Sequence, residues 1–241
     1  MKLREIADDT IAHATGRAHR ADEVRPGSGG PLGNARLTAW IGLALLVAFA
    51  AELVTLLDVR GLLAWHVAIG VLLIPPAIMK TASTGWRILR YYTGNGAYRR
   101  AGPPPFVFRV LGPLVVVTTL GVLGSGLVLI LLGPDASRQP QATLFGHTVD
   151  LLMLHKGAFV LWGVVTGLHV MGRLVPAWQA TLGVLDRAGE VPGRWLRGVA
   201  LAVTAAVAIG VTAMTVSLVD TSGWGRPQFG DRPRPGAHSD R

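Results

Sequence analysis

Five long apolar stretches constrain this chain more than any other feature of its sequence. A helix crosses the hydrocarbon core of a bilayer with about 20 mostly apolar residues. Five stretches of the 241-residue chain approach or exceed that length, and only 15% of all residues are charged. The sequence therefore predicts an all-α integral membrane bundle of five transmembrane helices. The expected spans cover residues 37–57, 62–79, 106–132, 148–175 and 196–219.

The polarity of the remaining sequence divides the chain into four parts. Residues 1–35 are polar and charged, and residues 220–241 are rich in Gly, Pro and Arg, so both ends are predicted to be flexible. Residues 36–175 hold the first four spans and form the expected four-helix core. Residues 176–219 supply a loop and the fifth helix. The paired prolines Pro75-Pro76 are expected to kink the end of the second span.

Basic residues alternate between the connections, and this predicts the topology. Lys and Arg concentrate in residues 2–36, 80–100 and 173–197, whereas the loops between these segments hold few. Basic loops lie on the cytoplasmic side of a membrane. The N-terminus is therefore expected in the cytoplasm and the C-terminus outside the cell membrane. The net charge of +9 then reflects topology and contact with anionic lipid, and we expect no nucleic-acid partner.

Histidines within the spans are the strongest candidates for function. The chain has no cysteine, which excludes thiolate ligands, disulfides and covalent haem attachment. His66 lies roughly 6 Å and His155 roughly 10 Å below the same face, from the helical rise. Two facing helices that each offer an imidazole at one depth can hold a haem iron. The alternative is a hydrogen-bonded structural pair or a proton path.

A third histidine, His169, follows His155 by 14 residues, which places both on nearly one face about 21 Å apart. This spacing suits a second haem near the inner face. The matching position on the second span is Lys80, a poor ligand, and no histidine lies in the other three spans. A hydrogen bond to a backbone carbonyl or a neighbouring span is therefore the favoured role of His169.

This layout resembles the membrane b-type cytochromes of formate dehydrogenases and nickel-iron hydrogenases, together with the bacterial cytochromes b561. The resemblance covers roughly residues 36–175. It implies that His66 and His155 bind an outer haem b and that His169 is a ligand of an inner one. Those families place the remaining inner ligand in an Arg-x-x-His-Trp motif, but residues 36–40 read Arg-Leu-Thr-Ala-Trp. Ala39 cannot bind iron, so we expect one haem.

The resemblance also implies a role in electron transfer. The expected partners are the lipid bilayer, a quinone and an extracytoplasmic redox protein, with the chain acting as a subunit of an oxidoreductase complex rather than as a separate enzyme. Two alternatives stay open: a non-redox scaffold or assembly subunit, and a proton or ion transporter that uses Glu52 and the membrane histidines. We favour a structural role in which Lys156 neutralises either Glu52 or a haem propionate. Otherwise, Glu52 accepts protons from a quinol.

The segment between the second and third spans, residues 84–105, contains a Gly-x-Gly fragment. No strand precedes this fragment, so it does not indicate a nucleotide site. Aromatic residues here favour an interfacial loop anchored at the membrane surface: Trp86, Tyr91, Tyr92 and Tyr98.

Overall fold

A computed structural model describes residues 3–17, 22–144, 146–182 and 191–224. Five of its helices are long and apolar enough to cross a membrane, which confirms the predicted number of spans. They run over Gly30–Asp58, Leu63–Tyr92, Phe106–Ser137, Leu151–Thr181 and Arg194–Leu218. The chain is therefore best described as a multi-pass membrane protein.

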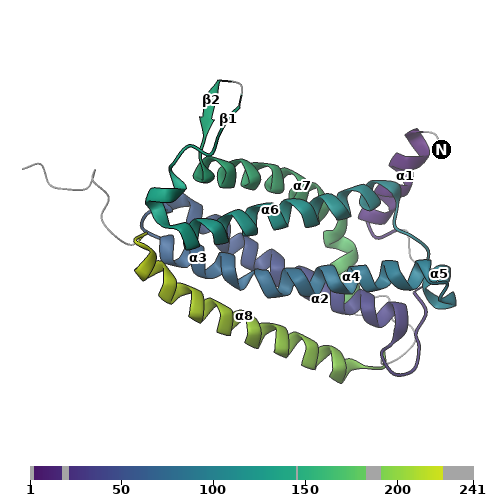
Figure 1. The fold of residues 1–241 in the computed structure, drawn as a ribbon. Coiled ribbons are helices and arrows are strands. Elements are labelled where there is room, and N and C mark those ends of the chain that lie inside the picture. Colours follow the sequence, from purple (N-terminus) through teal and green to yellow (C-terminus); the bar gives the residue numbers. More distant parts are fainter. Residues whose placement is uncertain (1–2, 18–21, 145, 183–190, 225–241) are drawn as a thin grey trace, which may run out of the picture.

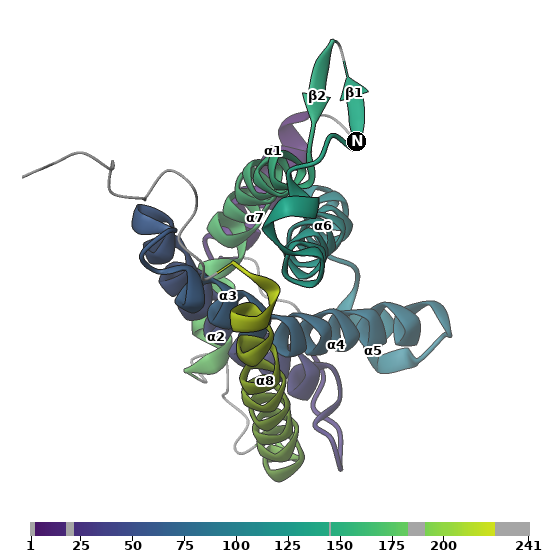
Figure 2. The same cartoon turned by 60° about the vertical axis from the view of Figure 1, so that its left-hand side comes forward.

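The spans pack as a bundle of tilted helices (Figure 1). Helix α6 (Phe106–Ser137) packs along α7 (Leu151–Thr181), and α2 (Gly30–Thr55) contacts both α7 and α4 (Ile74–Tyr92). Helix α8 (Arg194–Ser222) packs on α4 and on α3 (Leu63–Leu72). Helices α3 and α4 together form the second span, and α8 also contacts α6 and α2. Figure 2 shows α8 running away from the α6–α7 pair towards its N-terminal end.

The outer surface of the bundle is apolar over most of its length. Large side chains such as Met171, Leu131 and Val117 are exposed, and contiguous apolar surface on this scale is unusual for a protein in water. The fully buried core is small and lies where α2 meets the junction of α3 and α4, around Ile41, Leu45 and Leu73. Most apolar side chains therefore face outward, as expected when lipid is the solvent.

The second span is longer than predicted and is broken near its middle. Helix α3 ends at Leu72 and α4 begins at Ile74, with the prolines Pro75-Pro76 in its first turn. The helix is interrupted at Leu73, beside the prolines where the kink was predicted, and it continues to Tyr92 rather than ending at Met79. Proline is tolerated in a first helical turn, so it starts a new helix here. Much of the expected loop 84–105 is thus helical, and it includes the short helix α5 (Gly96–Ala101).

The connecting segments contain more structure than the sequence predicted. Helix α1 (Leu3–Ala14) packs on α6 and α7, so the expectation of a flexible N-terminal segment is wrong for these residues. A 3-10 turn, η1 (Leu56–Asp58), extends α2, and a two-stranded antiparallel hairpin joins α6 to α7. Its strands are β1 (Ala142–Leu144) and β2 (His147–Val149). Helix α8 continues to Ser222, and the tail from residue 225 lies outside the described residues.

Candidate functional site: a histidine pair inside the bundle

Two of the three predicted site histidines lie together between α3 and α7. The ring centroids of His66 and His155 are 6.4 Å apart, and the ring planes are nearly perpendicular, at 82°. Similar depth below the same membrane face predicted that these two rings would lie close together, and they do. Each ring is partly buried, so the pair lies at the protein interior rather than on the lipid surface.

The Nδ1 atom of His66 is held by two residues near the end of α2. It lies 2.8 Å from Glu52 Oε1 and 3.0 Å from Thr55 Oγ1. The single hydroxyl proton of Thr55 is donated to the Glu52 carbonyl oxygen at 2.6 Å. Both partners must therefore accept from His66, so its Nδ1 atom carries a proton. In the neutral ring, Nε2 keeps a free lone pair.

His155 has the same arrangement with a partner from α6. Its Nδ1 atom lies 2.9 Å from Ser125 Oγ, and that hydroxyl donates to the Val122 carbonyl oxygen at 3.1 Å. Because a serine hydroxyl has one proton, His155 Nδ1 is the donor to Ser125. Both imidazoles therefore keep Nε2 as an electron-pair donor, which is the form in which histidine binds metals.

Glycines leave space beside the two rings. A Cβ added to Gly126 on α6 would lie 3.2 Å from His155 Cε1, and one added to Gly70 would lie 3.6 Å from Glu52 Oε1. The first distance is shorter than ordinary van der Waals contact, so a side chain at residue 126 would displace the His155 ring. By contrast, a Cβ at Gly157 or Gly163 would meet nothing within 4 Å, and these two glycines do not shape the site.

Glu52 pairs with His66 and not with Lys156. The sequence favoured an ion pair between Glu52 and Lys156, but the Lys156 side chain is exposed on α7. Glu52 reaches His66 instead, because the turn that begins at η1 folds α3 back alongside the end of α2. The second carboxylate oxygen, Oε2, is buried and has no hydrogen-bond partner among the described residues.

The third predicted histidine, His169, does not join the pair. It follows His155 by 14 residues on the same continuous helix, about 21 Å along the axis. Its Nδ1 atom is buried and makes no hydrogen bond within the described part of the chain, so the hydrogen bond favoured from the sequence is not made at that atom. Its charged neighbours are Lys80 and Arg173. The Lys80 amine reaches towards the Thr38 carbonyl oxygen, 3.4 Å away.

The two histidines can supply two ligands to a metal that a cofactor also holds, or they can pass a proton. Among the described residues there is no cluster of three or more His, Asp or Glu side chains that could hold a metal ion. A metal bound here would thus need its other ligands from a cofactor, as haem iron does. The hydroxyls of Thr55 and Ser125 were missed in the sequence as parts of the site. Thr55 lies one helical turn after Glu52, which is the one signal that pointed to it.

No family model, no curated protein and no solved structure matches this chain. What the site does must therefore be argued from its residues.

Proposed function

We propose that this chain is a membrane b-type cytochrome in which His66 and His155 are the axial ligands of one haem b. The observation that supports this most is the 6.4 Å separation of the two ring centroids. An imidazole nitrogen lies about 2.0–2.1 Å from a bound metal, so rings that hold one ion from opposite sides have nitrogens about 4 Å apart and centres about 6–6.5 Å apart. The ring separation fits that value.

The hydrogen bonds at the two Nδ1 atoms support the same assignment. Metal-binding histidines generally donate their other N–H to a carboxylate, a carbonyl or a similar acceptor, which fixes the ring orientation and raises its basicity. Glu52 and Thr55 do this for His66, and Ser125 does it for His155. His66 and His155 would hold the haem, and when bound it would supply reversible one-electron oxidation and reduction.

The remaining residues of this chain determine how readily electrons move through that site. The Glu52 carboxylate places a negative charge at the edge of the His66 ring and favours the more positive, oxidised state. Its hydrogen bond at 2.8 Å also keeps the ring from rotating. Apolar surroundings exclude water, and the resulting low dielectric strengthens the influence of this charge.

The proposal includes one haem and not two. Ala39, which is buried on α2, stands where the resembling cytochromes carry an inner ligand. His169 lies near Lys80 and Arg173, and neither cation suits a position beside a ferric iron. The inner half of the bundle is therefore assigned no haem.

We further propose the topology and the partners that the sequence suggested. The N-terminus lies in the cytoplasm and the C-terminus outside, which places the histidine pair near the outer face of the cell membrane. From there the chain carries electrons between a quinone in the bilayer and an extracytoplasmic redox protein, as a subunit of an oxidoreductase complex. The charge of the connecting loops supports the orientation.

The proposal is tested by the colour and haem content of the purified protein. The chain, expressed in cells supplied with haem, should show a Soret band that sharpens and shifts on reduction with dithionite, with a haem-to-protein ratio near one. His66→Ala and His155→Ala should each abolish or convert this spectrum. A colourless preparation would refute the proposal, and a ratio near two would refute the single-haem assignment.

One observation favours a second candidate, a proton relay. Glu52 contacts His66, the His155 ring lies 6.4 Å further on, and Glu52 Oε2 is buried without a hydrogen-bond partner among the described residues. In that case the protein would be colourless and would move protons across vesicles. Loss of that movement in Glu52→Gln, without any haem signal, would identify the relay.

A further inference from the structure

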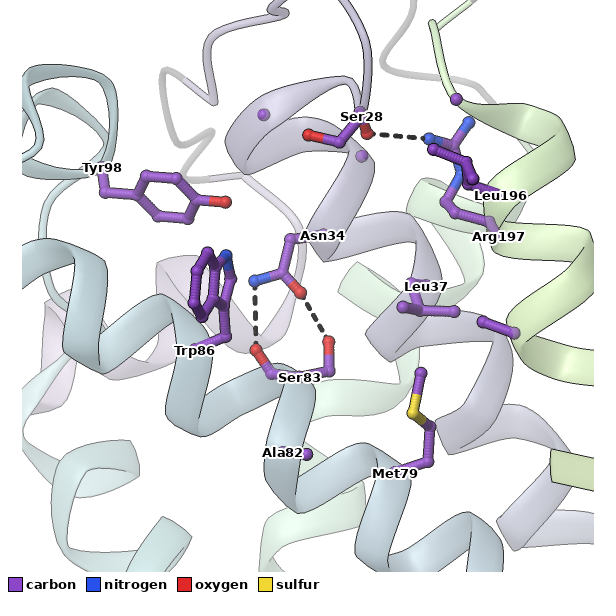
Figure 3. A pocket seen from close by; sticks show the side chains of 14 residues that line it. Ser28, Asn34, Leu37, Met79, Ala82, Ser83, Trp86, Tyr98, Leu196 and Arg197 are labelled. Atoms are coloured by element: carbon purple, nitrogen blue, oxygen red, sulfur yellow. Dashed lines mark hydrogen bonds between the residues drawn. The ribbon is translucent and has the colours of Figure 1, made fainter. Parts of the chain in front are cut away.

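A second candidate site lies at the opposite end of the bundle from the histidine pair. Here a cavity of about 450 Å³ opens between α2, α4, α5 and α8 (Figure 3). One wall is apolar and consists of Leu37, Met79 and Leu196. Asn34 and Ser83 form a polar part of the lining: the Asn34 Nδ2 donates to the Ser83 backbone carbonyl oxygen, and the Ser83 hydroxyl donates to Asn34 Oδ1. The proposed function does not use this cavity.

Two long helices begin at the rim of this cavity. Helix α2 starts after Gly29 and α8 after Gly193, and neither N-terminus has a side chain that caps it. The two starts touch, since a Cβ added to Gly193 would lie 2.7 Å from the Gly27 carbonyl oxygen. The first N–H groups of a helix lack partners within the helix and carry partial positive charge. Two such ends together favour an anion.

A buried tyrosine provides an independent indication of a ligand. Tyr98 is only 8% exposed, and its hydroxyl makes no hydrogen bond with any residue that the structure describes. Figure 3 shows this hydroxyl directed into the cavity, beside Trp86 and on the side of Asn34. The ring is buried while the hydroxyl faces the open space of the cavity. The Tyr98 hydroxyl is therefore a donor that is available to a bound group.

The charge around the cavity has one sign. The Arg197 guanidinium lines it and donates to the carbonyl oxygens of Ser28, Val191 and Pro192, at 3.2, 3.0 and 2.7 Å. Its charged neighbour is Arg36. None of the described lining residues is acidic. Arg197 thus holds the two helix starts together while its positive charge meets no carboxylate in the described contacts.

From these observations we propose that the cavity binds an anionic phospholipid of the leaflet that faces the basic loops. The phosphate accepts from the Tyr98 hydroxyl and lies at the two helix N-termini, where the charge of Arg197 adds to the attraction. The acyl chains lie along Leu37, Met79 and Leu196. This apolar wall identifies the source of the phosphate as a lipid, because a free phosphate ion would gain nothing from it. Basic pockets between transmembrane helices recognise lipid headgroups in this way.

The test measures lipid binding directly. The full-length protein in detergent is titrated with phosphatidylglycerol and, separately, with phosphatidylcholine of the same acyl chains, and native mass spectrometry counts the bound lipid. Phosphatidylglycerol should bind more tightly. Tyr98→Phe removes only the hydroxyl and should weaken phosphatidylglycerol binding by about three- to tenfold, the usual contribution of one hydrogen bond. Tyr92→Phe is the matched control, because Tyr92 is 81% exposed, and it should bind as the wild type does.

A second variant tests the volume of the cavity. Ala200→Phe places a ring in the apolar lining and should abolish phosphatidylglycerol binding while the melting temperature without lipid stays unchanged. Equal binding of the two lipids, or wild-type binding by Tyr98→Phe, would overturn the proposal. Displacement of the lipid by inorganic phosphate would identify a free-anion site instead, and displacement by a quinone would identify a quinone site. None of these results depends on haem.

Discussion

Replacing Glu52 with glutamine should raise the reduction potential of the proposed haem. Glu52 is the one carboxylate that contacts the histidine pair in the described residues, at 2.8 Å from His66 Nδ1. Glutamine has the same shape and still accepts the hydrogen bond, but it carries no charge. The oxidised state then loses a stabilising negative charge, so reduction becomes easier.

The size of the shift follows from the kind of hydrogen bond that is changed. A hydrogen bond to a charged group contributes about 1.5–3 kcal/mol and one between neutral groups about 0.5–1.5 kcal/mol, a difference of about 1–1.5 kcal/mol. For one electron, 1.4 kcal/mol corresponds to about 59 mV. Only the part of the difference that distinguishes the oxidised from the reduced state shifts the potential, so we expect a rise of up to about 60 mV. The Glu52 side chain is only 16% exposed, so solvent screens little of this effect.

Spectroelectrochemical titration of the purified variant measures this shift. Asp58→Asn is the matched control, since Asp58 is an exposed carboxylate at the same end of α2 whose Oδ1 bonds only the Gly61 N–H in the described contacts. It should change the potential by much less. A Glu52→Gln potential equal to the wild-type value, or lower than it, would refute the argument that this carboxylate favours the oxidised state.

Three further predictions concern other parts of the structure. Gly126→Val should weaken the affinity for haem about 10- to 100-fold, because the new side chain would meet the His155 ring. The haem content of the purified variant should therefore fall. Gly124→Val on the same helix meets nothing within 4 Å and should retain haem, which quantified haem per protein measures. His169→Ala should leave the absorption spectrum intact, and loss of all haem would show that the depth assignment is wrong. Finally, the hydrogen bond from Arg100 lowers the pKa of Glu23 below its ordinary 4.5. The pair therefore stabilises the fold above pH 4.5 and loses this effect as the pH falls further, so the melting temperatures of wild type and Glu23→Gln should converge in acid.

The number of spans and the meeting of two histidines were predictable from the sequence. Span number depends on apolar length, which the bilayer thickness fixes. The similar depth of His66 and His155 depends only on helical rise and on the direction in which each helix crosses, and a common depth is a condition for the two rings to meet. Span length and depth are both measured along the membrane normal, so they can be predicted from residue spacing in the sequence.

The partners of the two rings were not predictable in the same way. The sequence placed Glu52 near Lys156, but the contact is decided by how far α3 folds back on α2 at the turn η1, and this depends on three-dimensional packing. Ser125 was not predicted as part of the site, and its hydroxyl bonds His155 only because α6 lies beside α7. The helical residues after Met79 were missed because basic residues ended the apolar run while the helix itself continued.

The most direct test of the central claim is electron paramagnetic resonance of the oxidised protein. If His66 and His155, whose rings lie 6.4 Å apart, both hold the iron, the oxidised protein would give one low-spin ferric haem signal. We predict this one signal, with the intensity of one haem per chain and with its loss in both His66→Ala and His155→Ala. A high-spin signal, or no ferric haem signal from protein expressed with haem supplied, would contradict the account.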